Sequence, residues 1–394
     1  MAVDGITDVS SSKYRANVGR EIPIAFESSF MVCILGLPKV SAPMVAAFSD
    51  EFLQEYDINF DTCKNFIYMS FLKRGTSMKH IPVIATVGEI LVEFVSHKKN
   101  CGLSNISDYS GPYPSGAPAI FLDQAARMGA ETQLFGGVGN DGFGSCVLER
   151  LAAHGVGTSG VTIHPNHSTG VAFVSYYDNG NRDFIFHLAN TAADNFTVSE
   201  DLIDPSNTIL HISAASMGNT AMRDMILATM RMVYNAGGQI SCDPNARPEL
   251  MRDNAVRAAL NETMDCSTYL MPSTSDLDFL FPDMSEDAAV DHLLKAKAEV
   301  IVIKRGAKGA TIVGHGQRYD FAGHAVQELD PTGAGDCFGG TFISLLAQGS
   351  SLQDAGSQAN AAGALAVTRR GPMEGNSSPA ELKNFISTKR ENVA

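Results

Sequence analysis

A glycine-rich segment near the C-terminal end of the chain, Leu329–Asp336, runs directly into a helical pattern. Its small residues are Gly333, Ala334 and Gly335. Behind them, apolar residues recur at the spacing of one buried helix face, namely Phe338, Phe342, Leu345 and Leu346. Gly349 then marks the end of the helix. The pattern predicts a loop entering a helix N-terminus, where unpaired backbone N–H groups attract an anion, most often phosphate.

Asp336 closes the glycine-rich segment, and two roles are open to it. A carboxylate at this position either satisfies the N-terminus of its own helix or stands as a base beside a bound phosphate. On the spacing alone, the capping role is the more common of the two.

The length of the chain, 394 residues, is enough for one large α/β domain and an additional segment. A second start is visible at Met78, where Met-Lys-His-Ile-Pro leads into a β-branched run. We therefore expect one domain over 78–394 and an N-terminal extension of unknown role over 1–77. The extension is an appendage, sequence upstream of the true start, or a small domain of its own.

Charge and cysteine usage narrow the possible partners. The formal net charge of −14 disfavours nucleic acid, whose phosphates call for clustered Lys and Arg. Seven cysteines are scattered without a Cys-x-x-Cys pair, which predicts reduced thiols in a cytoplasmic protein rather than a disulfide framework or a zinc site. No apolar run reaches the ~20 residues of a membrane-spanning helix, so we expect no membrane association.

Apolar, β-branched runs alternate with helical patterns along the second part of the chain. Residues 81–94 form a near-continuous apolar run, as in a buried parallel strand, and 208–213 and 300–304 repeat the pattern. Asn179-Gly180 lies between two alternating runs over 169–186, which is a strong hairpin signal. Together these patterns predict a three-layer α/β domain around a mostly parallel sheet.

Three motifs of the chain resemble the signatures of one known family. They are Asp330-Pro-Thr-Gly-Ala-Gly-Asp-Cys-Phe, Gly136-Gly-Val-Gly-Asn-Asp-Gly-Phe-Gly and Gly111-Pro-Tyr-Pro-Ser-Gly-Ala. The family is the ribokinase (PfkB) family of carbohydrate kinases, and the order of motifs over about 79–390 is similar throughout. The resemblance implies a ribokinase-like fold with a small β lid, built from about 93–113 and 168–187. It also implies a homodimer that pairs through the lid.

The same resemblance implies a catalytic role for the glycine-rich segment. Asp336 would be the general base that deprotonates a sugar hydroxyl, whose oxygen then attacks the γ-phosphate of ATP. Backbone N–H groups of Gly333, Ala334 and Gly335 would form the anion hole for the charge that develops on the transferring phosphoryl group. These roles are physically consistent, because phosphoryl transfer needs positioning and electrostatic stabilisation more than covalent chemistry.

The resemblance further implies contacts with the sugar at Glu93, Gly116, Ala117, Asn140 and Arg247. Small residues at Gly116 and Ala117 let a sugar ring approach the backbone. Glu93 stands where the family usually has Asp, and an exposed strand position is its alternative. Arg247 follows an Asp-Pro-Asn motif, and a structural bridge between helix and loop is its alternative.

Contacts with ATP are implied at Lys304, Gly306, Gly309, Asn360 and Gly371. A plain strand-to-hairpin turn would also explain Gly306 and Gly309. Mg²⁺ is expected near Asp276, where the family usually has the longer Glu, because carboxylate oxygens suit this ion. Asp330 would border a site for a monovalent cation, with K⁺ as the candidate.

These features lead to one functional hypothesis with three alternatives. We expect ATP-dependent phosphorylation of a neutral monosaccharide, a ketohexose such as tagatose or fructose. Relatives that act on acidic keto-deoxy sugars have an Arg just after the lid ribbon, whereas 187–190 here read His-Leu-Ala-Asn, without a basic residue able to hold a carboxylate. The alternatives are a 2-keto-3-deoxygluconate kinase, a nucleoside kinase of the same family, and a non-catalytic regulator that binds a sugar or nucleotide.

Overall fold

The computed structural model describes residues 81–179, 181–246 and 250–391, together with four two-residue strands nearer the N-terminus. The chain divides into two units, Met1–Lys79 and His80–Ala394. In the first unit, the paired strands are β1 (Tyr14–Arg15) with β2 (Glu21–Ile22) and β3 (Phe26–Glu27) with β4 (Phe30–Met31), both antiparallel. The boundary expected before Met78 lies close to this division, and the role of the extension stays a prediction.

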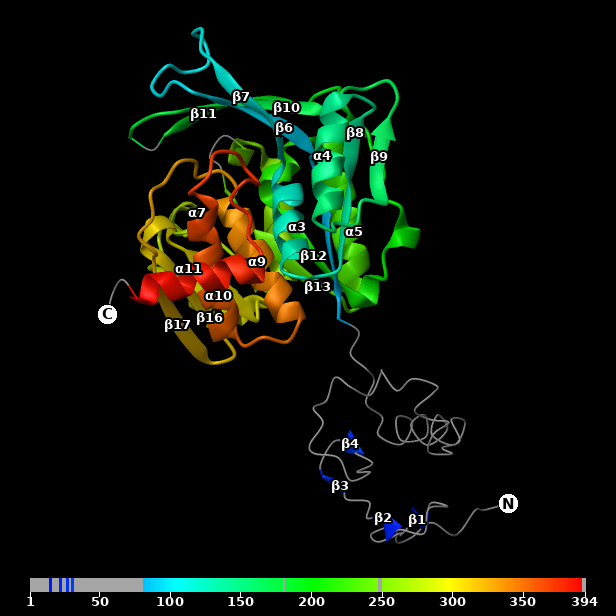
Figure 1. The fold of residues 1–394 in the computed structure, drawn as a ribbon. Helices are drawn as coiled ribbons and strands as arrows, with labels where there is room; N and C mark the ends of the chain where they lie inside the picture. The colour runs from blue at the N-terminus through cyan, green and yellow to red at the C-terminus, as the bar shows by residue number, and fades with distance from the viewer. Residues whose placement is uncertain are drawn as a thin grey trace. The chain divides into compact units, whose positions relative to one another are not determined.

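A nine-stranded sheet forms the centre of the second unit (Figure 1). Its strands are β5 (Val83–Val87), β8 (Thr132–Gly139), β9 (Gly160–His164), β12 (Thr208–Ser213), β13 (Gln239–Asp243), β14 (Tyr269–Leu270), β15 (Val300–Lys304), β16 (Gly309–Gly314) and β17 (Gln317–Ala322). In space their order is β17-β16-β15-β14-β13-β12-β5-β8-β9. The pairs from β15 to β9 are parallel, and only β16 and β17 join antiparallel. The predicted mostly parallel sheet is confirmed.

Helices cover both faces of this sheet and complete the three predicted layers (Figure 1). One face carries α3 (Ala117–Arg127), α4 (Gly142–Ala153), α9 (Ala334–Ala347), α10 (Leu352–Ala366) and α11 (Pro379–Glu391). The other carries α5 (Thr220–Asn235), α6 (Asn254–Cys266), α7 (Thr274–Leu280) and α8 (Glu286–Ala296). Strand residues alternate between the two cores, with Ile84 in the first and Ala85 in the second, as expected for strands buried on both faces. None of these described helices is long and apolar enough to cross a membrane.

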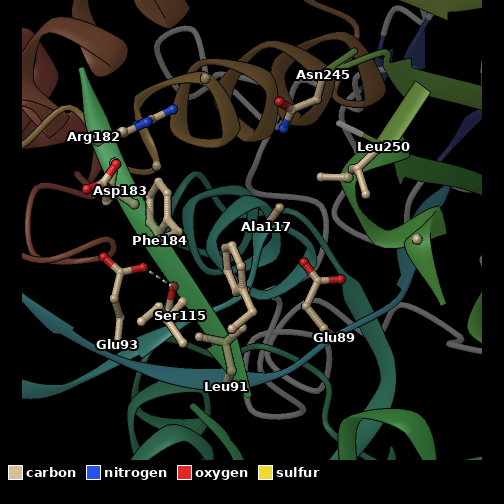
Figure 2. A pocket seen from close by; sticks show the side chains of 18 of the residues that line it. Glu89, Leu91, Glu93, Ser115, Ala117, Arg182, Asp183, Phe184, Asn245 and Leu250 are labelled. Carbon is tan, nitrogen blue, oxygen red and sulfur yellow. Dashed lines mark hydrogen bonds between the residues drawn. The ribbon is translucent and has the colours of Figure 1, made fainter. Parts of the chain in front are cut away.

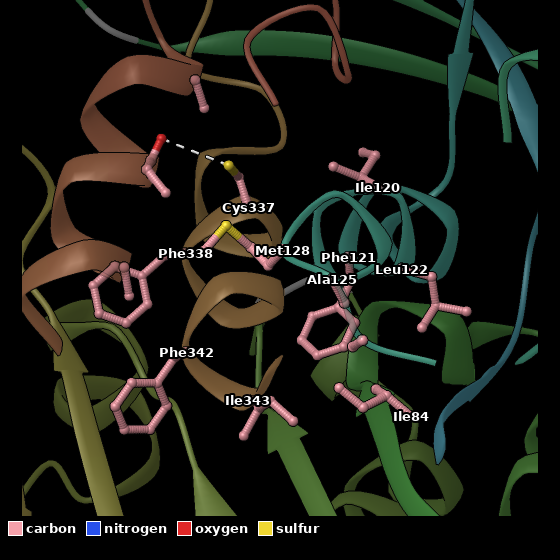
Figure 3. Close-up of a cluster of buried hydrophobic side chains, with 14 of the residues drawn as sticks. Ile84, Ile120, Phe121, Leu122, Ala125, Met128, Cys337, Phe338, Phe342 and Ile343 are labelled. Carbon is pink, nitrogen blue, oxygen red and sulfur yellow. Dashed lines mark hydrogen bonds between the residues drawn. The ribbon is translucent and has the colours of Figure 1, made fainter. Parts of the chain in front are cut away.

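Helix α9 is buried along most of its length, between α3 and α10 (Figure 3). Its residues from Cys337 to Leu345 are all buried. Phe342 of α9 and Phe121 of α3 belong to one hydrophobic core. The two helices approach closely because Gly340 has no side chain, and a Cβ there would lie 2.4 Å from the carbonyl oxygen of Phe121. This packing fixes where the N-terminus of α9 opens.

A second, four-stranded sheet forms the lid above the ends of the central strands (Figure 1). Its strands are β6 (Leu91–Ser96), β7 (Tyr109–Ser115), β10 (Gly170–Tyr176) and β11 (Arg182–His187), in the order β11-β10-β6-β7. Strands β10 and β11 pair antiparallel, so the predicted hairpin is confirmed. The lid is thus assembled from two separate parts of the chain.

The apolar run over 81–94 is two strands in different sheets, and the prediction of one strand is wrong. Strand β5 ends at Val87 in the central sheet, and β6 begins at Leu91 in the lid. Gly88 lies in the break, where a Cβ would come within 2.6 Å of the Pro118 side chain. The break is a tertiary feature, because periodicity alone does not distinguish a continuous apolar run from a broken one.

Candidate active site

A large cavity lies between the lid and the carboxyl ends of the central parallel strands. Its volume is about 1830 Å³, whereas a pocket for one drug-sized ligand has ~300–1,000 Å³. Residues at or just after the ends of β5, β12, β13, β14 and β15 line it. Ligands of open α/β sheets bind outside the carboxyl ends of the strands. The cavity is therefore in the expected place, and it is larger than a pocket for one drug-sized ligand.

The glycine-rich loop forms one wall of the cavity. Gly333 adopts the left-handed conformation, with φ at 78°, directly before α9. A Cβ there would lie 2.4 Å from the carbonyl oxygen of Pro372, so only glycine fits this position. Gly333, Gly335 and Asp336 line the cavity, whereas Ala334 is not among the described lining residues. The N-terminus of α9, where backbone N–H groups lack partners within the helix, thus borders the cavity.

Lys304 lies beside this loop, at the end of β15. A Cβ at Gly335 would be 3.4 Å from the Lys304 ammonium nitrogen. The ammonium donates a hydrogen bond to Asp243 at the end of β13, and both side chains are largely buried. Burial opposes the charge on Lys304, but the neighbouring carboxylates, Asp243 first among them, outweigh it and raise the pKa of Lys304. A positive charge therefore stands next to the helix N-terminus, where both attract an anion.

Asp276 is held by a capping box at the start of α7. Its carboxylate accepts hydrogen bonds from the N–H of Ala246 (2.8 Å) and from the N–H and hydroxyl of Ser273 (2.7 and 2.6 Å). Asp276 lines the cavity, yet protein donors already engage its oxygens. Within the described ranges, no cluster of three or more His, Cys, Asp or Glu side chains suited to a metal ion occurs. This donor set fits a hydrated Mg²⁺ held through water better than one bound directly.

Two buried carboxylates line the cavity, Glu89 between β5 and β6 and Glu93 on lid strand β6 (Figure 2). They are 8% and 2% exposed, which excludes an exposed strand position for Glu93. The Ser115 hydroxyl donates to Glu93 at 3.3 Å. Gly116 has φ at 108° and packs so tightly that a Cβ would lie 2.3 Å from the Glu89 carbonyl oxygen. With Ala117, which also lines the cavity, these residues make a small-residue wall next to two hydrogen-bond acceptors.

The lid strand β11 supplies another wall of the cavity. Arg182, Asp183 and Phe184 line the cavity from this strand (Figure 2). The Arg182 guanidinium carbon lies 5.3 Å from the centre of the Phe184 ring. Residues 187–190 after β11 contain no Lys or Arg, as noted above. Arg182 nevertheless brings a basic side chain to the cavity lining from the start of that strand.

Several predicted site residues lie outside the described cavity lining: Asn140, Gly306, Gly309, Asp330, Asn360 and Gly371. Asn140 is exposed in the turn after β8. The Asn360 side chain donates to the carbonyl of Ala322 at 2.8 Å, and Ala322 pairs with Gly309 in the sheet. A Cβ at Gly309 would lie 1.9 Å from the carbonyl oxygen of Phe321. The alternative of a sterically required turn thus accounts for Gly309.

Asp330 is completely buried, and protein donors surround its carboxylate. It accepts from the N–H of Thr332 (3.0 Å), from the N–H of Gly371 (2.9 Å) and from the hydroxyl of Tyr176. These donors stabilise the carboxylate without a cation. A K⁺ site bordered by Asp330 stays a prediction.

Sequence reasoning missed Asp243, Glu89 and Arg182 as cavity residues. Asp243 belongs to the Asp-Pro-Asn motif from which only Arg247 was chosen, and Arg247 lies outside the described residues. The sequence positions of two of them could have indicated the cavity. Asp243 ends a buried strand and Glu89 follows one, and the carboxyl ends of parallel strands converge on one edge of the sheet.

The fold and the cavity together define a class of protein. A β lid covers the carboxyl edge of a three-layer α/β domain, and a glycine loop with Asp336 and Lys304 faces the space between them. This arrangement is that of a ribokinase-like phosphotransferase. The chain belongs to the pfkB family of carbohydrate kinases, whose sequence profile matches residues 83–379. The protein is therefore a carbohydrate kinase.

Relatives with assigned activities agree with this family. A fructokinase from Vibrio alginolyticus is 30% identical over 281 residues, which cover 69% of this chain and 91% of the relative. A 2-dehydro-3-deoxygluconokinase from Bacillus subtilis is 29% identical over 311 residues, which cover 77% and 95%. An E. coli protein provisionally named ribokinase II, solved in complex with ATP and Mg²⁺, matches with a TM-score of 0.73 and 38% identity, over 78% of this chain and 99% of that one. These relatives support sugar phosphorylation by an ATP-using kinase.

Asp243→Asn should destabilise the protein by about 3–5 kcal/mol, because it leaves the buried Lys304 ammonium without its charged partner. The double variant Asp243→Asn/Lys304→Met removes both charges and should recover most of this loss. Urea-induced unfolding measures both free energies. A double variant as unstable as the single one would show that the ion pair is not the cause.

Proposed function

We propose that the enzyme transfers the γ-phosphoryl group of ATP to a hydroxyl of a neutral monosaccharide, a ketohexose such as tagatose or fructose. The observation that carries this proposal is the convergence of Asp336, Lys304 and the buried Glu93 on one cavity. A carboxylate base, a cation beside a helix N-terminus and an acceptor for sugar hydroxyls thus face the same space.

In the proposed reaction, Asp336 takes the proton of the attacking hydroxyl. The sugar oxygen forms a bond to the γ-phosphorus while the bond from that phosphorus to the bridging oxygen of ADP breaks. The N–H groups of Gly333, Ala334 and Gly335 at the start of α9, together with Lys304, stabilise the negative charge on the transferring group. Bound Mg²⁺ would neutralise part of the charge of the ATP phosphates. The lid over the cavity excludes water that would otherwise compete as acceptor.

The charge of the cavity supports a neutral sugar. Glu89 and Glu93 are placed to accept hydrogen bonds from hydroxyl groups and would repel a substrate carboxylate on their side. Asn245, which also lines the cavity, adds an amide that donates and accepts (Figure 2). Leu91 and Leu250 offer apolar surface to the C–H groups of a sugar ring. A cavity with several hydrogen-bonding groups for hydroxyls and with apolar surface for C–H groups fits an uncharged monosaccharide.

Asp336→Asn should lower kcat by ~10²-fold or more, because the variant lacks the general base, and should leave the sugar KM little changed. ADP release measured with tagatose, fructose, ribose, 2-keto-3-deoxygluconate and adenosine, each with ATP and Mg²⁺, first identifies the substrate. The matched control is Asp354→Asn, which changes an exposed carboxylate in the first turn of α10, outside the cavity lining, and should keep full turnover.

Unchanged turnover in Asp336→Asn would rule out this residue as the base. Preference for adenosine over every sugar would favour the nucleoside kinase. Sugar or nucleotide binding by calorimetry without any ADP release would favour the non-catalytic regulator.

A 2-keto-3-deoxygluconate kinase is the second candidate, and the position of Arg182 at the cavity favours it. A guanidinium binds a carboxylate with two parallel hydrogen bonds. If the substrate is this acidic sugar, Arg182→Gln should lower its kcat/KM by ~10- to 100-fold. With a neutral ketohexose the same variant should keep nearly full activity. Arg318→Gln, on β17 and outside the cavity lining, is the matched control for both.

The lid also supports a homodimer. Strand β11 is an edge strand of the lid sheet, and on it Ile185 and Phe186, which also line the cavity, are 43% and 45% exposed. An edge strand with exposed apolar side chains is a template for pairing with another copy. Sedimentation velocity should find a dimer at micromolar concentration, and Ile185→Lys/Phe186→Lys should shift it to monomer. A monomeric wild-type protein would refute this part of the proposal.

A further inference from the structure

Tyr176, the last residue of lid strand β10, reaches out of the lid to the glycine-rich loop. Its hydroxyl donates to the Asp330 carboxylate and lies 2.5 Å from the Thr332 hydroxyl oxygen. Because the Tyr176 proton goes to Asp330, the Thr332 hydroxyl is the donor in the second contact. The lid is thus hydrogen-bonded directly to the segment that leads into Gly333 and α9.

Asp330 gathers three separate parts of the fold around one buried charge. Its Oδ1 accepts from Tyr176 of the lid and from the Thr332 N–H of the loop, and its Oδ2 accepts from Gly371 after α10. Asp330 is 0% exposed, so water has no access to replace a lost hydrogen-bond donor, and the loss of one costs free energy. Hydrogen bonds to a charged acceptor are among the stronger ones in proteins. Loss of one donor should therefore shift the loop as well as the lid.

The Tyr176 hydroxyl is the donor in its contact with Asp330. Burial, followed by the Asp330 carboxylate, raises the pKa of Tyr176 above its ordinary value. Both effects favour the protonated phenol. The neighbouring Tyr177 differs from Tyr176, because its hydroxyl donates to Asp183 of β11, within the lid.

Tyr176 is also connected to the wall of the cavity. In the β10–β11 register, Tyr176 stands directly opposite Arg182, which lines the cavity with Asp183 and Phe184. A substrate that contacts Arg182 at the start of β11 would therefore touch the residue paired with Tyr176. The other end of the connection is Gly333, whose left-handed backbone begins α9.

We propose that Tyr176 is a positioning residue that latches the lid to the anion-hole loop, so that lid closure and the geometry around Gly333–Asp336 are set together. This inference deepens the proposed function and rests on it. In this role Tyr176 touches neither substrate, and it acts only through Asp330 and Thr332.

The test compares Tyr176→Phe, which removes only the hydroxyl, with Tyr269→Phe. Tyr269 is a partly buried tyrosine on β14 whose hydroxyl accepts from Gln239 at 3.1 Å, outside the cavity lining. Tyr176→Phe should lower kcat by ~10- to 100-fold, as small misplacements of catalytic groups do, with the sugar KM nearly unchanged. Backbone amides of 329–340 should exchange with deuterium faster than in the wild type. Tyr269→Phe should change neither quantity.

A third variant, Thr332→Val, removes the other hydroxyl of the contact. If the two act as one latch, Tyr176→Phe/Thr332→Val should lose little more kcat than either single variant, because residues in one network are not additive. Additive losses would overturn the proposal, and so would a lower kcat with unchanged exchange at 329–340.

Deuterium exchange also separates this inference from the proposed function. Should no sugar of the panel be phosphorylated, faster exchange at 329–340 in Tyr176→Phe alone would still support the latch, and unchanged exchange would refute it. Full activity of Asp336→Asn would refute the general base without affecting the exchange result.

Discussion

The burial of α9 is the constraint on which the rest of the structure depends. Its residues from Cys337 to Leu345 are buried, and the helix packs between α3 and α10. Its N-terminus therefore opens at one place only, and Gly333 lets the chain enter it at an angle that other residues do not allow. Packing in the hydrophobic core thus fixes the position of the backbone N–H groups at the start of α9, which the proposed reaction uses to bind an anion.

A buried ion pair and a buried carboxylate connect this helix to its surroundings. The Lys304–Asp243 pair lies beside the loop, and the Asp330 carboxylate joins the loop to the lid and to the segment after α10. Charges removed from water are costly unless they are matched, so each group requires its partners to stay in place. Separating these segments would leave a buried charge without its partners, and this free-energy penalty keeps segments together that are far apart in the sequence.

Residues of both the central domain and the lid line the cavity. The loop, Lys304 and Asp276 belong to the central domain, whereas Arg182 and Phe184 belong to the lid. In the proposed reaction, the groups beside the transferring phosphoryl group would thus lie on elements packed into the core, whereas lid strand β11 would bring Arg182 and Phe184 to the substrate.

The sequence by itself determined the α/β class, the parallel sheet, the lid hairpin and the loop before α9, because each depends on local periodicity or on a consecutive motif. It also singled out Asp336, Gly116 and Lys304, all three of which line the cavity. Tertiary structure alone decided that 81–94 breaks between two sheets at Gly88, that Asp243 pairs with Lys304, and that Arg182 reaches the cavity. It also decided that Asn140 lies away from the cavity and that Tyr176 meets Asp330. Contacts of this second kind join residues many positions apart, and no local pattern encodes which of them meet.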